Sequence, residues 1–88
     1  MVMTASVFLK RFRQVKTYLA EHDNVSPELA EAFEKVASDF KGTYTPEAFK
    51  LLLSEDGPIE GGLEDDLTSA SVLCNRDRAR QVSIKDED

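Results

Sequence analysis

The chain has little cysteine and histidine, two residue types on which many catalytic and metal sites depend. Its 88 residues include one cysteine, one histidine and no tryptophan. A single cysteine, Cys74, cannot form an internal disulfide, which favours a reducing, cytoplasmic compartment. The apolar runs are short, and none approaches the roughly 20 residues that a membrane-spanning helix needs. We therefore expect a small intracellular domain that does not enter a membrane.

Acidic side chains are missing from the first 20 residues. That stretch holds four bases, whereas residues 21–88 hold all 17 acids and the other seven bases, giving a net charge of −6 for the whole chain. An acidic balance opposes binding to nucleic-acid phosphates and suits a basic protein surface. We expect the four N-terminal bases to face acids within the fold or solvent; they are Lys10, Arg11, Arg13 and Lys16.

Helical spacing of apolar residues and two clear start signals predict three helices. The first lies over 4–22, where apolar residues recur at steps of three and four. Ser26-Pro27-Glu28 and Thr45-Pro46-Glu47 each place a capping hydroxyl before a proline and an acid, which is typical of helix starts. They predict helices over 26–41 and 45–55, which Gly42 and Gly57-Pro58 respectively would end.

The pattern after the third helix is weaker. Residues 54–66 contain six acids, three glycines and no base, and we expect an acidic loop there. Apolar residues at 63, 67, 70 and 74 then fit a fourth helix over 63–74, although a short strand over 70–74 is an alternative because several residues there are poor helix formers. From 75 onward the sequence is polar, which predicts a mobile tail.

The sequence thus predicts an all-α fold, a small bundle of three to four helices. The bundle domain would span 1–74 and the polar charged tail 75–88. Phenylalanines fill half of the expected core and supply much of its area. The predicted core residues are Phe8, Phe12, Val15, Leu19, Leu29, Phe33, Val36, Phe40, Phe49 and Leu52.

Catalytic and cofactor chemistry is not expected. Cys74 lies on an apolar stripe and His22 at a helix end, so neither has the setting of an activated pair. Residues 56–67 superficially resemble a calcium-binding loop, but Pro58 and Leu67 stand where an oxygen ligand and a bidentate glutamate are required. We expect no metal ion and no cofactor.

Protein binding is the function that the pattern favours. A run of acids with no base attracts a cationic partner over a distance. We expect a non-enzymatic inhibitor or adaptor that covers a basic surface of another protein. The expected contact residues are Glu55, Asp56, Glu60, Glu64, Asp65 and Asp66.

Two alternatives belong to other classes. The helical stripes of a small core could pair with copies of themselves, giving a homodimer or a larger structural assembly. A small DNA-binding regulator is the other alternative, with residues 26–42 and 45–56 as a loose helix-turn-helix. Its second helix would offer Glu47, Lys50 and Glu55 to a phosphate-lined groove, which fits poorly, so we do not expect nucleic acid as the partner.

Overall fold

The described part of the chain forms four helices. The computed structural model describes the backbone of residues 3–86 and the side-chain surroundings of residues 3–81. The helices are α1 (Ala5–Glu21), α2 (Pro27–Thr43), α3 (Pro46–Glu55) and α4 (Gly61–Asp86), and no strand occurs over the described residues. The predicted all-α bundle is therefore confirmed.

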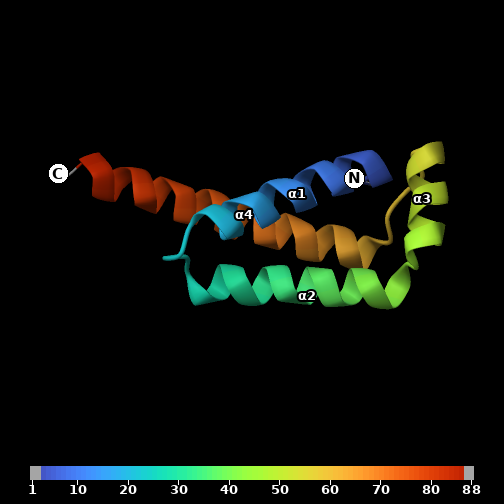
Figure 1. Cartoon of the computed structure of the whole chain (residues 1–88), viewed down its shortest axis with the longest axis horizontal. Helices are drawn as coiled ribbons and strands as arrows, with labels where there is room; N and C mark the ends of the chain where they lie inside the picture. Colours follow the sequence, from blue (N-terminus) through green and yellow to red (C-terminus); the bar gives the residue numbers. More distant parts are fainter. Residues whose placement is uncertain (1–2, 87–88) are drawn as a thin grey trace.

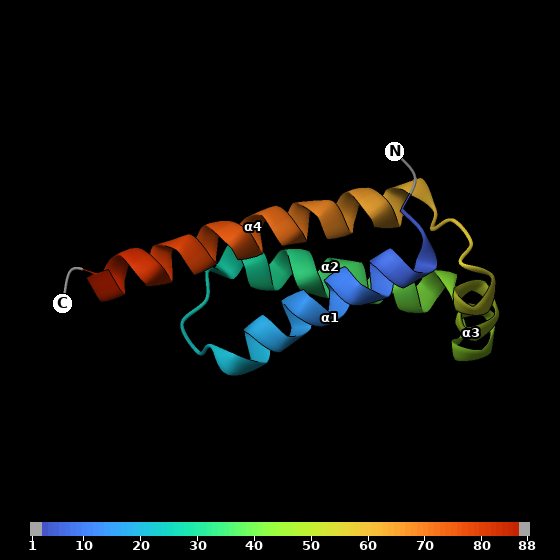
Figure 2. The same cartoon turned by 90° about the horizontal axis from the view of Figure 1, so that it is seen from above.

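Three helices run along the long axis of the molecule, and α3 lies across one end (Figures 1 and 2). Helix α4 packs most extensively against α2, and α1 lies against both. The far end of α4 projects beyond the connection between α1 and α2, which gives the molecule extents of 48 × 21 × 20 Å. No helix over residues 3–86 is both long and apolar enough to cross a bilayer.

The two proline start signals act as predicted. The Ser26 side chain accepts a hydrogen bond from the Leu29 amide at 3.3 Å, and the Thr45 side chain accepts one from the Ala48 amide at 3.0 Å. Each bond satisfies an amide that has no partner within its helix. The predicted end of α2 is wrong, because the helix passes through Gly42 to Thr43 and is capped by Tyr44 in an extended conformation.

The predicted loop over 54–66 is wrong in extent. Helix α3 continues to Glu55, and α4 already begins at Gly61. The connection is pinned to the start of α1: the Ala5 amide donates to the Gly57 carbonyl and the Ile59 amide to the Met3 carbonyl, both at 2.8 Å. Buried Ile59 anchors this short segment in the core, and the segment is therefore ordered rather than a free loop.

Helix α4 differs most from the sequence prediction. It is a helix where a strand over 70–74 was the alternative, and it continues past Cys74 to Asp86. Residues 75–81 also take part in packing, since Asp77 is only 3% exposed. The helix therefore crosses the predicted boundary between bundle and tail; Glu87 and Asp88 lie outside the described residues.

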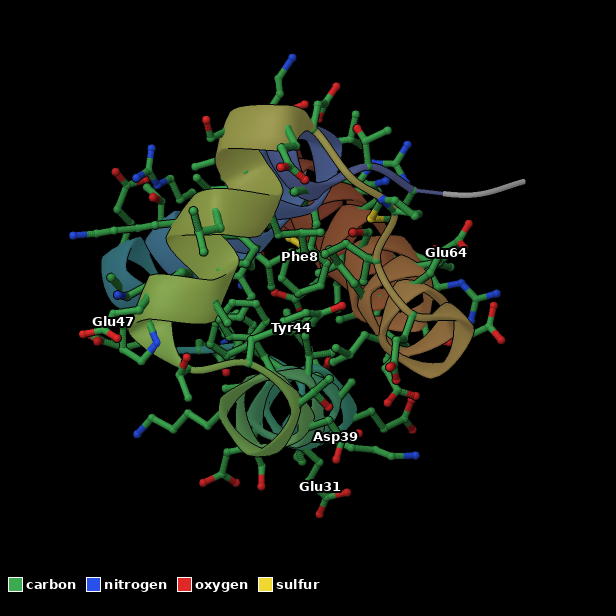
Figure 3. The ribbon with its side chains drawn as sticks, turned by 90° about the vertical axis from the view of Figure 1, so that its right-hand side faces the viewer. Phe8, Glu31, Asp39, Tyr44, Glu47 and Glu64 are labelled. Atoms are coloured by element: carbon green, nitrogen blue, oxygen red, sulfur yellow. The ribbon has the colours of Figure 1, made fainter. Side chains whose placement is uncertain are left out.

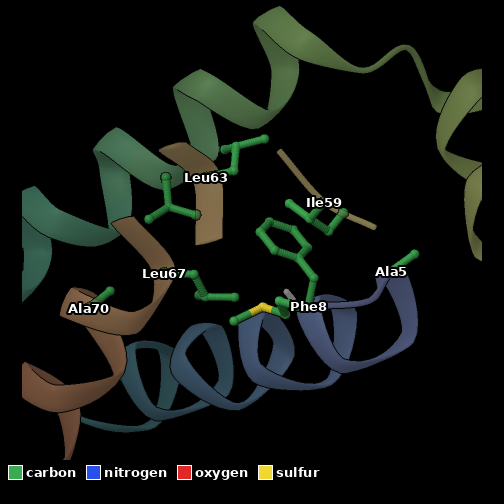
Figure 4. Packing of buried hydrophobic residues seen from close by; sticks show 8 residues of the cluster. Ala5, Phe8, Ile59, Leu63, Leu67 and Ala70 are labelled. Atoms are coloured by element: carbon green, nitrogen blue, oxygen red, sulfur yellow. The ribbon is translucent and has the colours of Figure 1, made fainter. Parts of the chain in front are cut away.

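The core contains all ten predicted residues, four of them fully buried and six packed around these. Phe8 is 1% exposed and lies against Ile59, Leu63 and Leu67 (Figure 4). Aromatic rings extend the cluster, with Phe40 centred 5.2 Å from Phe8 and 4.8 Å from Phe49. The apolar stripe of α4 completes the core; its members Leu63, Leu67, Ala70 and Cys74 are all buried.

Candidate functional site

The six predicted contact residues lie at the end of the bundle where α3 connects to α4. We call this surface the acidic end. Glu55 closes α3, Asp56 and Glu60 lie in the connection, and the last three occupy the first turns of α4. Figure 3 looks onto this end and shows Glu64 of α4 and Glu47 of α3 pointing outward.

Acids at the start of α4 have a local physical reason to be there. The first amides of a helix lack internal partners and carry a partial positive charge, which stabilises nearby carboxylates by about 0.3–1 kcal/mol each. Glu64 lies in the first turn of α4, and Asp65 and Asp66 follow it. Helix geometry thus turns a run of acids in sequence into a fixed acidic surface.

Asp56 has a structural role. Its carboxylate accepts hydrogen bonds from the Ser6 hydroxyl at 2.6 Å and the Ser6 amide at 3.2 Å. These bonds cap the start of α1, where the Thr4 side chain makes no capping bond. They also lower the pKa of Asp56 below its ordinary value. Asp56 adopts the left-handed conformation with φ of 52°, which aspartate tolerates better than most residues.

Asp66 joins a small group of charges between α2 and α4. Lys35 Nζ lies 3.6 Å from Asp66 Oδ1. Asp39 of α2 also shares a hydrogen bond with Asp66, and this bond raises the pKa of Asp39. Two carboxyl groups therefore lie near one ammonium group. The Lys35 side chain is 68% exposed, so solvent weakens its ion pair with Asp66.

A hollow of about 320 Å³ opens beside Asp39 and Asp66. We call it the acidic hollow. Asp39, Glu60 and Asp66 supply three carboxyl groups to its lining, and Leu63 supplies an apolar part. The sequence did not single out Asp39, because it lies 27 positions before Asp66 and no local pattern links them. Only the packing of α2 against α4 brings them together.

A second polar cluster, around Asp77, is buried. The Tyr18 hydroxyl, the Ser26 amide at 3.2 Å and Arg80 Nη2 at 2.8 Å all donate to the Asp77 carboxylate. Burial alone raises the pKa of Asp77, but these bonds outweigh it and lower the pKa below the ordinary value. Burial and the bond to Asp77 raise the pKa of Tyr18 to about 12. This cluster fastens α4 to α1 and to the start of α2.

His22 and Cys74 have separate surroundings. The His22 ring stacks on Tyr18 with centroids 4.1 Å apart, and its Nδ1 lies 2.9 Å from the Tyr18 carbonyl oxygen. Cys74 is buried, its Sγ lies 4.0 Å from Arg78 Nη2, and burial raises the pKa of its thiol. A raised pKa disfavours the nucleophilic thiolate, and the contacts of the two residues do not join them.

The bases of α1 are exposed. Among the residues whose side chains are described, none of Lys10, Arg11, Arg13 and Lys16 forms an ion pair with an acid. Over the same residues no three histidine, cysteine, aspartate or glutamate side chains are grouped as a metal site. Comparison with protein-family models, with curated proteins and with solved structures gave no match.

Proposed function

We propose that this chain is a non-enzymatic protein-binding module, an inhibitor or adaptor whose acidic end covers a basic surface of a partner protein. The observation that carries the proposal is the excess of carboxylate around the acidic hollow. Asp39, Glu60 and Asp66 line it, and the adjacent Lys35 is the base that pairs with Asp66. A lysine or arginine side chain of a partner would supply the missing positive charge.

The energetic reason lies in the shared hydrogen bond between Asp39 and Asp66. The hydrogen bond with Asp66 is the main cause of the raised pKa of Asp39, and desolvation and repulsion between the two carboxylates add to it. A guanidinium group can donate to two carboxylates at once through strong, charge-assisted bonds. Binding a basic side chain would relieve the repulsion and lower the pKa of Asp39.

The remaining acids would guide the encounter. Glu55, Glu60 and Asp65 are exposed, and Glu64 is half-buried at the start of α4. Such a surface attracts cations over roughly a Debye length, about 8 Å at physiological salt. Because Asp56 already caps α1, we assign steering to Glu55, Glu64 and Asp65, and anchoring to the carboxyl groups of the acidic hollow.

Self-association through the apolar stripes is the alternative function. Those stripes pack within the chain: Phe8, Leu29 and Leu67 are each at most 1% exposed. The apolar stripes therefore lend less support to a homodimer than the exposed acids lend to a basic partner.

Capture from native lysate, followed by kinetics with the recovered partner, tests the proposal. The test variant Glu60→Lys/Asp65→Lys reverses two charges at the acidic end. The matched control Glu31→Lys/Glu34→Lys reverses two exposed charges on α2. At low salt the test variant should associate about tenfold more slowly than the control, and the difference should shrink as salt is added.

The single variant Asp39→Asn tests the anchoring role separately. It should speed dissociation with little effect on the association rate, because it changes a contact formed only in the complex. Equal association rates for the two double variants, or capture of the same partner in equal amount by both, would contradict the proposed function.

A further inference from the structure

A groove along α1 carries charge of the opposite sign. It has a volume of about 770 Å³ and runs beside residues from Ser6 to His22 of the first helix and its cap. Leu53 of α3 and Arg78 of α4 also line it, and Arg78 lies over the Tyr18 ring. We call it the α1 groove.

Three cations line the α1 groove, and Glu21 is the one acid among its lining residues. Lys10 and Arg13 stand one turn apart on α1. The guanidinium carbon of Arg78 lies 5.3 Å from the centroid of the Tyr18 ring, which holds this third charge in place. Over the residues with described side chains, none of the three forms an ion pair with an acid.

We propose that the α1 groove binds an extended acidic segment of a second protein. From Ser6 to His22 the helix rises about 24 Å, at about 1.5 Å per residue. An extended peptide advances roughly 3.3 Å per residue, so about seven of its residues fit this length. The cations would pair with its carboxylates, while Leu9, near the start of α1, and Leu53 of α3 offer apolar contacts.

A peptide fits this groove better than a nucleic acid. Proteins that hold single strands present aromatic rings on which bases stack. The aromatic side chains that line the groove are Tyr18, which is 3% exposed, and His22, whose ring already stacks on Tyr18. The net charge of −6 also repels a long phosphate backbone, whereas a short acidic segment meets only the local cations.

The inference extends the proposed function without depending on it. With the acidic end for a basic partner and the α1 groove for an acidic one, the chain would act as an adaptor that joins two proteins. An inhibitor would need the acidic end alone. The two surfaces involve different residues, and each can be altered separately.

Fluorescence anisotropy with a labelled acidic peptide tests the inference. The probe is a peptide of about seven glutamates with one leucine near an end, matched to the groove length. The variant Lys10→Glu/Arg13→Glu reverses two charges inside the groove. The control Arg11→Glu/Lys16→Glu makes the same change on the same helix at positions that do not line it. Circular dichroism of both variants checks that they fold.

The groove variant should lose about tenfold or more in affinity, and the control less than about threefold, because close charge pairs outweigh distant ones in salt. A peptide with glutamine in place of glutamate should not bind. Glu60→Lys/Asp65→Lys should bind the acidic peptide at least as well as wild type, which separates this test from that of the acidic end.

Three results would overturn the inference. Equal losses in the two double variants would show attraction to net charge alone. Tighter binding of single-stranded oligothymidylate than of the acidic peptide would assign the groove to nucleic acid. Concentration-dependent self-association in sedimentation, abolished by Lys10→Glu/Arg13→Glu, would assign it to a second copy of this chain.

Discussion

Replacing Asp77 by alanine should destabilise the fold more than any change at the acidic end. Asp77 is 3% exposed and accepts hydrogen bonds from Tyr18, Ser26 and Arg80. Alanine would leave the buried Tyr18 hydroxyl without its acceptor, which costs about 1–3 kcal/mol. It would also remove the bond from the Ser26 amide, one of the contacts that hold the α1–α2 connection to α4.

The expected total follows from the surroundings of each donor. The Arg80 side chain is 45% exposed, so water replaces most of what its bond contributes. The amide of Ser26, the N-cap residue of α2, loses a charge-assisted hydrogen bond, which adds to the cost. Removing a buried carboxylate also removes its desolvation penalty, which offsets part of that cost. We expect Asp77→Ala to lower the free energy of unfolding by about 2–4 kcal/mol.

Urea denaturation followed by far-ultraviolet circular dichroism measures this change. The matched control is Asp65→Ala, an exposed acid on the same helix, which should stay within about 0.5 kcal/mol of wild type. A double-mutant cycle with Tyr18→Phe should give a coupling energy of about 1–2 kcal/mol between Tyr18 and Asp77. If Asp77→Ala is as stable as Asp65→Ala, the reasoning about this cluster is wrong.

Three other changes have defined outcomes. Because the folded pKa of Asp77 is lowered, its contribution is present above the ordinary value of 3.8 and is lost as pH falls through the folded pKa; acid titration of Asp77→Asn should show a shallower loss of stability. Leu67→Ala removes a side chain that is 0% exposed and should cost about 2–5 kcal/mol in thermal or urea unfolding. Ser26→Ala removes the bond to the Leu29 amide and should cost about 1 kcal/mol, whereas an unchanged midpoint would show that the cap contributes nothing.

Much of the fold was predictable because local signals agreed with one another. The hydroxyl, proline and acid at 26–28 and at 45–47 place helix starts that the structure retains. The apolar stripes identified the core residues for the same reason, since a helix of 3.6 residues per turn can bury only one face. These features depend on neighbours in sequence.

The extent of α4 depended on distant contacts. Asp77 stands three positions after Cys74, and so continues the stripe formed by Leu63, Leu67, Ala70 and Cys74. From the sequence alone, an aspartate at this position is expected to face solvent, because charged residues are seldom buried without partners. Its donors come from α1 and the start of α2, and Gln81 and Arg80 also reach the Asn24 carbonyl at 2.8 and 3.1 Å. Extending the stripe by one step would have revealed the position.

The run of acids at the acidic end could be predicted from the sequence, but the different roles of the individual acids could not. Asp56 caps α1 through Ser6, which lies 50 positions earlier, and Asp66 meets Lys35 and Asp39 only because α2 packs on α4. Composition cannot distinguish an acid used by the fold from one left for a partner. The α1 groove was missed because Leu53 and Arg78 reach it from other helices.

Mapping the contact surface on the protein tests the central claim most directly. In a nitrogen-15 NMR titration with the captured partner, the account predicts the largest amide shifts in residues 55–66 and in the part of α2 around Asp39. The side-chain carboxyl signal of Asp39 should also titrate at lower pH in the complex, because a bound cation lowers its pKa. Shifts concentrated on other surfaces, with residues 55–66 and Asp39 unchanged, would contradict the account.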